Sequence, residues 1–385
     1  MTASIKKYHA SAFLLESHPI RTVSFSPSHD GRTFAVGTNS KALRICRISK
    51  DDRSIEILHE RAGHHLGSVY CSSWNADSTL LATGSNDKTV KVCKVFLDDD
   101  GSQQPGARGG YFGAGGAGNY GSHVGGDGVI SSSFERDDLV LKGHTGTVRD
   151  VSFHPSDPTR LLSCGAHNNV ALLWDIVGVA NQGDGTVRPI AMLEGHEDTV
   201  FCGRFSPFET HFAATGASDN TVRVWDLRGP TSKGSAIVTS FESAPLSLVW
   251  SSDGYGILTS HADGTIRSID LRASKGQVSG GGGGGSGRSL SQIASVTNAH
   301  VSECRSIDAT PCGRYLLSSS FDGTASVFTM PTLGVAGPEF NAQIRGKGGG
   351  KLLQGKWRNK GKPGFIVAGS EGLTYYCEKD ESKYS

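Results

Sequence analysis

Residues 194–228 contain four side chains whose types and spacing could carry chemistry: His196, Thr215, Asp219 and Trp225. A histidine held by a carboxylate and bonded to a hydroxyl is the arrangement that activates a nucleophile in hydrolases. The same groups, joined to an indole N–H, can instead form a hydrogen-bonded chain that fixes one unit of structure. Because the set recurs in part at repeat spacing, the sequence favours the structural interpretation. Losing one member would leave its buried partners unpaired, at about 1–3 kcal/mol each.

Further copies of this segment are found from the polar residue of its tight turn. Asp219 lies at this turn in GASDNTVRVW, and Asp87 has the same place in GSNDKTVKVC. Five more copies place there the residues Ser40, Asn168, Asp263, Asp322 and Glu371, of which Ser40 and Glu371 mark the weakest copies. Each copy contains short alternating or apolar runs that predict antiparallel strands. The chain therefore contains seven copies of one all-β unit.

Two glycine-rich insertions explain the two longest intervals between copies. Residues 98–135 lie between the second and third copies, and residues 274–290, with glycine at every position from 280 to 285, lie between the fifth and sixth. Such segments bury too little apolar surface to fold and are expected to be disordered loops. Without them the spacing returns to about 40–45 residues, which is typical of a single repeat. They are therefore insertions between copies and not domain boundaries.

Most copies depart from the set of four side chains. The second copy has Cys93 in place of tryptophan. The third keeps His144 and Trp174 but has Cys164 at the position expected for the hydroxyl. The fifth has Thr259 and Asp263 but is expected to lack the histidine, and the first and seventh copies have almost none of the set.

The segment 194–228 opens on Gly-His and closes on Trp-Asp, and it resembles a WD40 repeat. The resemblance implies an all-β fold, a single seven-bladed WD40 β-propeller over residues 8–379, with four strands in each blade. The last copy ends near Glu378 with no room for a fourth strand. We therefore expect the N-terminal segment Ser11–Glu16 to complete the last blade, which removes an open sheet edge.

Composition limits the function classes. The net charge is +1, from 38 basic and 37 acidic residues, which argues against a nucleic-acid partner. The eight cysteines fit no zinc pattern and are expected to be buried thiols in a reducing compartment. No apolar run reaches the roughly 18–20 residues that span a bilayer, so a cytoplasmic protein is expected. Without a phosphate-loop, zinc-protease or serine-hydrolase motif, we expect no enzyme, cofactor, metal or small-molecule substrate.

One local charge feature lies between Phe340 and Ser370, where no acidic residue occurs. The segment carries the basic residues Arg345, Lys347, Lys351, Lys356, Arg358, Lys360 and Lys362. They predict an electropositive patch for an acidic partner, such as the acidic tails of tubulin, or for nucleic acid. The alternative is a solvated hairpin in which Trp357 is a core residue of blade seven.

A second candidate contact follows the third strand of blade four. The run Trp225-Asp226-Leu227-Arg228 fits the W-D-x-R pattern with which some propellers dock on the adaptor of a cullin-type ubiquitin ligase. Ile269-Asp270-Leu271-Arg272 is a degenerate second copy. Arg228 is therefore a candidate interaction residue for a substrate receptor of such a ligase.

The first two copies go beyond the general WD40 pattern. Residues His18–Cys46 and His64–Val92 resemble the opening of the C-terminal propeller of the nemitin family, which is linked to microtubules and to the central-pair microtubules of motile cilia. The homopolymeric glycine insertions are similar to those of green-algal proteins. Together these resemblances imply a protein-interaction scaffold of the microtubule cytoskeleton, in the ciliary axoneme. Its partners would be axonemal proteins, microtubule-associated proteins or tubulin.

Overall fold

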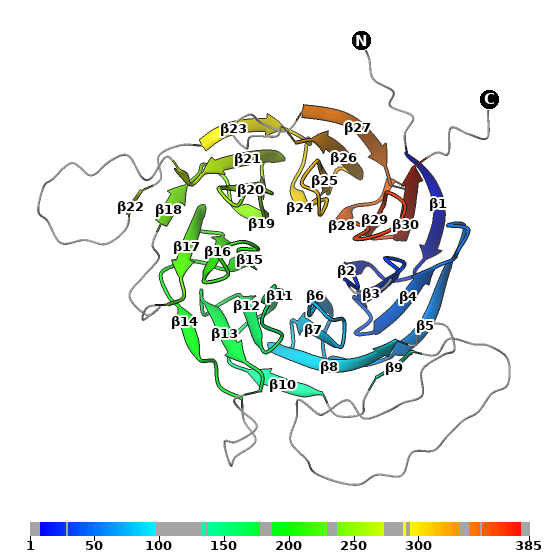
Figure 1. Cartoon of the computed structure of the whole chain (residues 1–385), viewed down its shortest axis with the longest axis horizontal. Coiled ribbons are helices and arrows are strands. Elements are labelled where there is room, and N and C mark those ends of the chain that lie inside the picture. The colour runs from blue at the N-terminus through cyan, green and yellow to red at the C-terminus, as the bar shows by residue number, and fades with distance from the viewer. Residues whose placement is uncertain are drawn as a thin grey trace, which may run out of the picture.

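The computed structural model describes residues 8–27, 30–97, 132–134, 138–177, 187–228, 237–272, 288–289, 293–330, 339–346 and 349–378. These residues form seven antiparallel sheets arranged in a ring, so the expected all-β, seven-bladed propeller is confirmed (Figure 1). In the described part of the chain, no helix is long and apolar enough to cross a membrane.

Each blade is numbered here from the copy that supplies its inner three strands. Blade one consists of β2 (Ile20–Phe25), β3 (Thr33–Thr38), β4 (Leu43–Ile48) and β5 (Ile55–Arg61). Blade two consists of β6 (Val69–Trp74), β7 (Leu80–Ser85), β8 (Thr89–Leu97) and β10 (Leu139–Lys142), with β9 (Ser132–Phe134) on the end of β8. Blade three consists of β11 (Val148–Phe153), β12 (Arg160–Gly165), β13 (Ala171–Asp175) and β14 (Ala191–Leu193).

Blade four consists of β15 (Val200–Phe205), β16 (Phe212–Ala217), β17 (Thr221–Asp226) and β18 (Ile237–Ser240), with the two-residue strand β22 (Arg288–Ser289) beside β18. Blade five consists of β19 (Pro245–Trp250), β20 (Gly256–His261), β21 (Thr265–Asp270) and β23 (Ile293–Asn298). Blade six consists of β24 (Cys304–Ala309), β25 (Tyr315–Ser320), β26 (Thr324–Thr329) and β27 (Glu339–Arg345). Blade seven consists of β28 (Leu352–Trp357), β29 (Gly364–Gly369), β30 (Gly372–Glu378) and β1 (Tyr8–Leu15).

The N-terminal strand closes the ring, as the sequence predicts. β1 pairs antiparallel with β30, from Tyr8 opposite Glu378 to Leu15 opposite Gly372. The strand starts earlier than the expected Ser11. In Figure 1 the first and last strands lie side by side at the edge of blade seven. This pairing joins the two ends of the described chain in one sheet and leaves no open blade.

The core lies between the blades. Seven clusters of buried hydrophobic side chains occur in the described residues, one at each contact between neighbouring blades. The second strand of a blade is covered on both faces, which explains why every residue of β3, β7 and β20 is buried. The outermost strand β5 contains only intermediate and exposed residues, as expected at a blade's outer edge.

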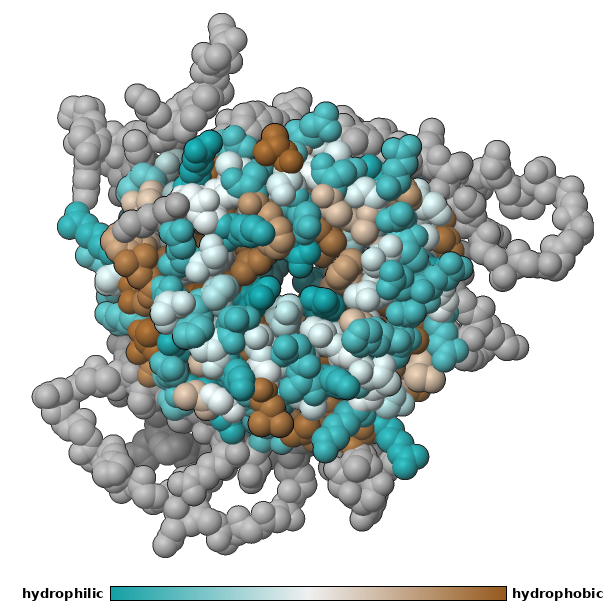
Figure 2. Space-filling view, turned by 180° about the vertical axis from the view of Figure 1, so that it is seen from behind, coloured by the Kyte–Doolittle hydropathy of each residue, from teal (hydrophilic) through white to brown (hydrophobic). Residues whose placement is uncertain are grey.

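The inner strands β2, β6, β11, β15, β19, β24 and β28 surround the centre of the ring (Figure 1). Figure 2 shows one face of the molecule, where mainly hydrophilic residues surround the opening at the centre. The ring thus presents two faces, an outer edge and a channel to partners.

Most of the predicted insertions 98–135 and 274–290 lie outside the described residues. Their final parts include the strands β9 and β22, which extend the sheets of blades two and four. All eight cysteines are thiols, seven buried and Cys312 exposed. Burial raises the pKa of Cys46 to about 12, so its thiol stays protonated.

Candidate functional site

The four candidate residues of blade four meet in one hydrogen-bonded chain. His196 Nδ1 lies 2.9 Å from Asp219 Oδ2, and His196 Nε2 lies 2.7 Å from Thr215 Oγ1. The indole N–H of Trp225 donates to Thr215 Oγ1 over 2.8 Å. With the histidine proton on Nδ1, the ring donates to the carboxylate and accepts from the hydroxyl, so each group has a partner.

The hydrogen bonds run from carboxylate to histidine to hydroxyl, as in a catalytic triad, but the hydroxyl is not accessible. Thr215 has no exposed surface, and Trp225 is 1 % exposed. A nucleophile must reach a substrate, whereas this hydroxyl lies between β15 and β17 inside the sheet. The network of blade four therefore joins the loop before the blade to its second and third strands.

Asp219 is the most connected member. Besides the histidine it accepts hydrogen bonds from the backbone N–H groups of Glu197 (2.9 Å) and Thr221 (3.0 Å) and from the Thr221 hydroxyl (2.7 Å). Burial alone would raise the pKa of Asp219, but the hydrogen bonds from His196, Thr221 and the Glu197 N–H hold it well below its usual range. The carboxylate is ionised at neutral pH and serves as the fixed acceptor of the turn.

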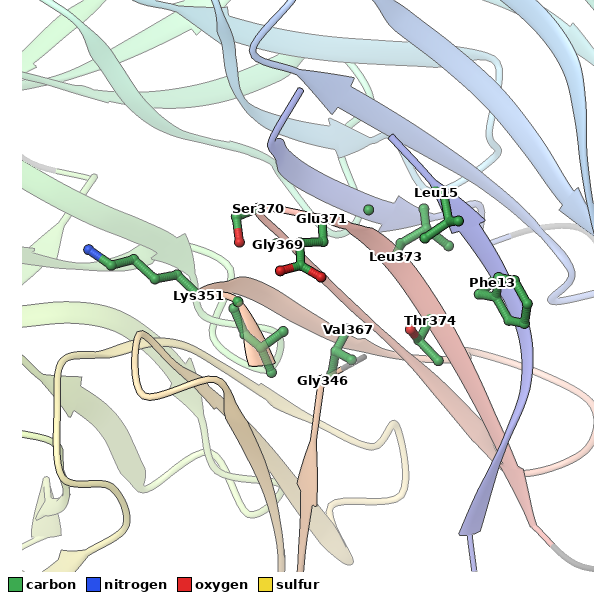
Figure 3. Close-up of a pocket in the computed structure, with 13 residues that line it drawn as sticks. Phe13, Leu15, Gly346, Lys351, Val367, Gly369, Ser370, Glu371, Leu373 and Thr374 are labelled. Atoms are coloured by element: carbon green, nitrogen blue, oxygen red, sulfur yellow. The ribbon is translucent and has the colours of Figure 1, made fainter. Parts of the chain in front are cut away.

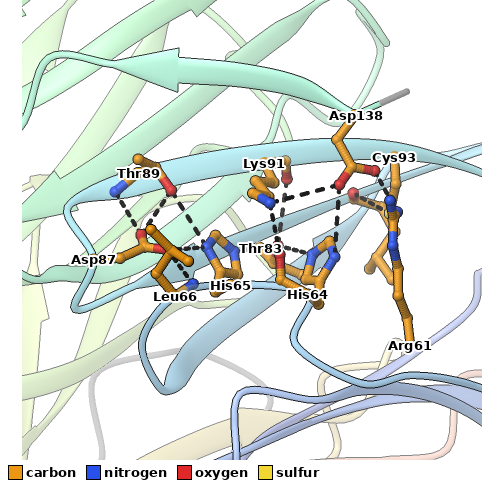
Figure 4. A network of polar contacts seen from close by, with 11 residues as sticks. Arg61, His64, His65, Leu66, Thr83, Asp87, Thr89, Lys91, Cys93 and Asp138 are labelled. Atoms are coloured by element: carbon orange, nitrogen blue, oxygen red, sulfur yellow. Dashed lines mark hydrogen bonds and ion pairs between the residues drawn. The ribbon is translucent and has the colours of Figure 1, made fainter. Parts of the chain in front are cut away.

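In blade two, which lacks the tryptophan, a second histidine contacts the hydroxyl instead (Figure 4). His65 Nδ1 contacts Asp87 Oδ2 at 2.9 Å, as in blade four. The ring nitrogens Nε2 of His64 and His65 lie 2.8 and 2.9 Å from the same Thr83 hydroxyl. His64 thus contacts the hydroxyl that a tryptophan indole contacts in blade four, while the Cys93 thiol donates to the Leu81 carbonyl at 3.4 Å.

Asp138, which is distant in the sequence, also contacts the residues of this network. It comes from the segment before β10 and is 5 % exposed. It accepts from Arg61 Nη1 at 2.6 Å and lies 3.7 Å from His64 Nδ1 (Figure 4). Burial, with the positive charges of Lys91 and Arg61 contributing, lowers the pKa of His64 to about 2. His64 is therefore neutral, and the buried cluster links the outer strands of blades one and two.

The structure corrects the hydroxyl position in blade three. Ser163, not Cys164, accepts from the Trp174 indole at 2.8 Å and contacts His144 Nε2 at 2.7 Å. Cys164 pairs with Asp150 on the next register position. The turn between β12 and β13 has one residue more than the corresponding turn of blade four. Counting back from Asn168 by the spacing of blade four therefore reaches Cys164 instead of Ser163. With Ser163, blade three has a complete network.

Blade five also has a histidine, which the sequence comparison missed. His261 lies at the end of β20, and its Nε2 contacts the Thr259 hydroxyl at 2.8 Å. The other blades supply this ring from the loop before the first strand, so a search at that place fails. In blade six His300 contacts Ser318 at 2.7 Å. At the corresponding positions of blades one and seven, Val36 and Val367 replace the hydroxyl.

Acidification is expected to destabilise the fold from about pH 6.5 downward. Burial lowers the pKa of both His144 and His261 to about 4, against 6.5 for an unperturbed histidine. Between these values the unfolded chain binds protons that the folded chain does not. The free energy of unfolding should then fall by about 1.4 kcal/mol per pH unit for each such histidine. The stabilisation is fully present above the unfolded pKa and is lost as the pH falls.

Urea unfolding at about pH 7.5 and about pH 5 measures this effect, with a lower midpoint expected at the acidic pH. His144→Gln should weaken the pH dependence. An unchanged midpoint would contradict neutral, buried histidines.

The basic segment is divided by the fold into groups with different surroundings. Lys356 Nζ lies 2.7 Å from Asp308 Oδ1, and Arg358 Nη1 lies 3.2 Å from Asp52 Oδ1. These two acids come from blades six and one. The two cations are therefore paired, although the basic segment itself contains no acidic residue. Trp357 is 2 % exposed and packs in the core, as its alternative interpretation predicts.

The remaining basic residues lie at the two ends of β28. Lys351 precedes the strand and is exposed, as is Arg345 at the end of β27. Lys360 and Lys362 are exposed in the hairpin that follows the strand. A six-residue strand is about 20 Å long, so the two groups of basic residues lie toward opposite faces of the propeller. Lys347 lies outside the described residues.

Arg228 and Arg272 have the same geometry on neighbouring blades. Each guanidinium binds the aspartate two residues earlier through two hydrogen bonds: Arg228 with Asp226 at 3.0 and 2.7 Å, and Arg272 with Asp270 at 3.0 and 2.9 Å. The side chains are 64 % and 39 % exposed. The two planar groups are thus held in fixed orientations on the surface, where a partner can reach them.

A shallow pocket lies where β1 closes blade seven (Figure 3). Phe13 and Leu15 of β1 line one side, and Lys351 extends away from them. Its ionisable lining groups are Lys351 and Glu371, and most of the remaining wall is glycine or apolar. Within the described residues, no three histidine, cysteine, aspartate or glutamate side chains are grouped to hold a metal ion. The pocket therefore offers one cation and one carboxylate beside a mainly apolar wall.

Four segments of the chain match the family described as WD domain, G-beta repeat, over residues 55–94, 137–175, 184–226 and 291–329. Each segment includes the outermost strand of one blade and the first three strands of the next. The matches end in blades two, three, four and six. These are the described blades in which a histidine from the preceding loop contacts a buried hydroxyl. The side-chain network thus coincides with the recognisable repeats.

Two curated proteins show related repeats. The chain is 31 % identical over 129 residues to Coronin-7 of Rattus norvegicus. This match covers 33 % of this chain and 13 % of that protein. It is 26 % identical over 197 residues to Autophagy-related protein 16 of Arabidopsis thaliana, covering 51 % of this chain and 33 % of that protein. The chain therefore spans a third or less of the length of these relatives.

Proposed function

Because the chain is a seven-bladed WD40-repeat β-propeller, we propose that it is a non-catalytic protein-interaction scaffold of the microtubule cytoskeleton in the ciliary axoneme. WD40 propellers generally act as non-catalytic scaffolds that bind other proteins. The observation that carries the proposal is the burial of the blade networks. The one complete His–Thr–Asp–Trp set expected from the sequence has its hydroxyl enclosed in a sheet, where it stabilises a blade.

The placement on microtubules is supported by the resemblance of the first two copies to the nemitin family. His18–Cys46 covers β2, β3 and most of β4, and His64–Val92 covers β6, β7 and part of β8. These strands belong to two neighbouring blades, whose inner strands β2 and β6 lie next to each other in the ring. The resemblance therefore covers one continuous sector of the propeller.

Exposed cations support an acidic partner such as the tails of tubulin. Lys360 and Lys362 at one end of β28, and Arg345 and Lys351 at the other, are exposed in the structure. Charges at such positions steer an acidic partner toward the surface and are screened by salt. The expected partners are axonemal proteins, microtubule-associated proteins or tubulin, without a membrane, a nucleic acid or a small-molecule substrate.

Fractionation of ciliated cells of the source organism tests this placement. We expect the protein to remain with detergent-extracted axonemes, together with tubulin, while a cytosolic marker enzyme is washed out. Recovery of the protein in the detergent extract alone, with the axonemes free of it, would remove the ciliary placement.

A second candidate function is that of a substrate receptor of a cullin-type ubiquitin ligase. The supporting observation is the pair of exposed, identically held guanidinium groups of Arg228 and Arg272 on blades four and five. A repeated geometry on neighbouring blades can form one docking surface for the ligase adaptor. The two functions require different partners, and these can be identified in native cell fractions.

A further inference from the structure

A β-bulge occurs at the same place in all seven inner strands. In each strand the register shifts between the first and third residues, so the second residue is unpaired. A bulge redirects the side chain of its extra residue. The residues concerned are Arg21, Tyr70, Arg149, Phe201, Leu246, Arg305 and Leu353, and all seven line one hollow at the channel.

Three of these seven side chains are arginines, and they lie against aromatic rings. The guanidinium carbons of Arg21 and Arg149 lie 4.9 and 5.2 Å from the centre of the Tyr70 ring. That of Arg149 is also 5.8 Å from the Phe201 ring. Cation–aromatic contacts of this kind hold the guanidinium groups in place while leaving their N–H donors for a ligand.

A second group of cations extends the ring over blade six. Arg305 lies 5.1 Å from the centre of the Phe321 ring, and Lys351 Nζ lies 4.8 Å from the same ring. Burial lowers the pKa of Arg305; Glu303 opposes this, and the positive charges of Arg149 and Arg21 add to it. Arginines from blades one, three and six are thus close enough to repel one another across the channel.

Little negative charge balances these arginines. Arg21 donates to the neutral amide oxygen of Asn39 at 3.3 Å, and the buried Nε of Arg149 has no hydrogen-bond partner among the described residues. Glu303 meets Arg305 at 3.3 Å but is 41 % exposed. The carboxylate of Asp150, deeper in the same hollow, is engaged by Arg204 and by the Gly203 N–H.

We propose that this channel ring binds an extended peptide that carries several anionic side chains. The arginines come from three separate blades, so a ligand with spaced anionic groups satisfies them better than a single small anion does. Leu246 and Leu353 supply apolar contact between the charges. Nucleic acid is disfavoured, because base stacking needs an open aromatic face and cations already lie over Tyr70 and Phe321.

This inference deepens the proposed scaffold function by naming the chemistry of a partner, and it rests on that function for the partner's biological source. Anionic side chains come from glutamate-rich segments or from phosphorylated serines. The two sources share the same recognition by guanidinium groups.

Binding of two fluorescein-labelled peptides to the full chain, followed by fluorescence anisotropy, tests the proposal. One peptide is an oligoglutamate and the other a serine peptide with two phosphates. We expect at least one to bind, with an affinity that falls as salt is added. The triple variant Arg21→Gln, Arg149→Gln and Arg305→Gln should weaken that binding about tenfold or more.

A matched control removes the same charge elsewhere. Arg53, Arg160 and Arg314 are exposed outside the channel, and their replacement by glutamine should change the affinity by less than about twofold. If the channel triple fails to fold, Leu353→Glu provides a second variant. It adds a carboxylate beside intact arginines and should weaken binding of the anionic peptide by a similar factor.

Binding of neither peptide, equal losses in the two triple variants, or tighter binding of a single-stranded RNA of equal charge would overturn the proposal. It fails independently of the axonemal placement. Peptide binding by a protein absent from axonemes would support the channel site alone, whereas an axonemal protein that binds neither peptide would overturn the channel site alone.

Discussion

Replacing Ala12 by aspartate is expected to lower the free energy of unfolding by about 3–5 kcal/mol, because it buries an unpaired carboxylate. Ala12 is 1 % exposed on β1 and packs with buried residues of blades seven and one, among them Ile20 and Tyr375. β1 is the only strand of blade seven that precedes the first blade in the sequence, so its detachment would open the ring. A point change in one strand should therefore affect the whole propeller.

Phe13→Asp is the matched control. Phe13 is the next residue of the same strand, and its side chain is 53 % exposed on the opposite face. Chemical unfolding should show a change of less than about 1 kcal/mol for this variant. Equal destabilisation by the two aspartates would contradict a closure that depends on the buried face of β1.

Replacing Asp219 by alanine is expected to cost about 3 kcal/mol of stability. The change removes the acceptor of four hydrogen bonds, from the His196 ring, the Glu197 N–H, and the N–H and hydroxyl of Thr221. The histidine is 7 % exposed, and its Nδ1 would keep only the 3.2 Å contact with the Thr221 hydroxyl. Loss of this one carboxylate is therefore expected to loosen the turn between β16 and β17 and the loop that precedes β15.

Two further variants separate this role from a general loss of charge. Asp198→Ala removes an exposed carboxylate in the same loop, which accepts only the Thr199 N–H at 2.6 Å among the bonds described, and should cost less than about 1 kcal/mol. Asp219→Asn should retain part of the stability, since Asn168 contacts His144 in blade three. Thermal unfolding of the three variants measures the order, and a stability of Asp219→Ala equal to that of the unmodified chain would contradict the structural role.

Much of the fold follows from the sequence because the repeat is visible in it. The turn residues locate seven blades, and the missing last strand predicts the closure by the N-terminal segment. The four side chains of blade four are also found, since their spacing matches the repeat. What remained hidden depends on small shifts and on distant residues.

Three features of the sites show these limits. One extra turn residue moves the hydroxyl of blade three to Ser163, which no fixed spacing predicts. Asp138 reaches His64 only because β10 returns beside β8 after a long insertion. The basic segment loses part of its free charge to Asp308 and Asp52 of other blades.

The channel ring is a different case, because its signal is present in the sequence but distributed over it. Each of its seven residues follows the first residue of an inner strand, and only the closed ring brings them together. Aligning the inner strands and reading their second position would have found the three arginines. Local charge along the chain does not reveal them, because each lies in a different blade.

Cross-linking mass spectrometry of the native cytoskeletal fraction tests the scaffold role most directly. It identifies the partners and the propeller face that they contact through lysines such as Lys351, Lys360 and Lys362. We predict cross-links from this protein to tubulin or to microtubule-associated proteins. Cross-links confined to the adaptor of a cullin-type ubiquitin ligase, and lost when Arg228 is replaced by alanine, would contradict the microtubule scaffold and establish the second function.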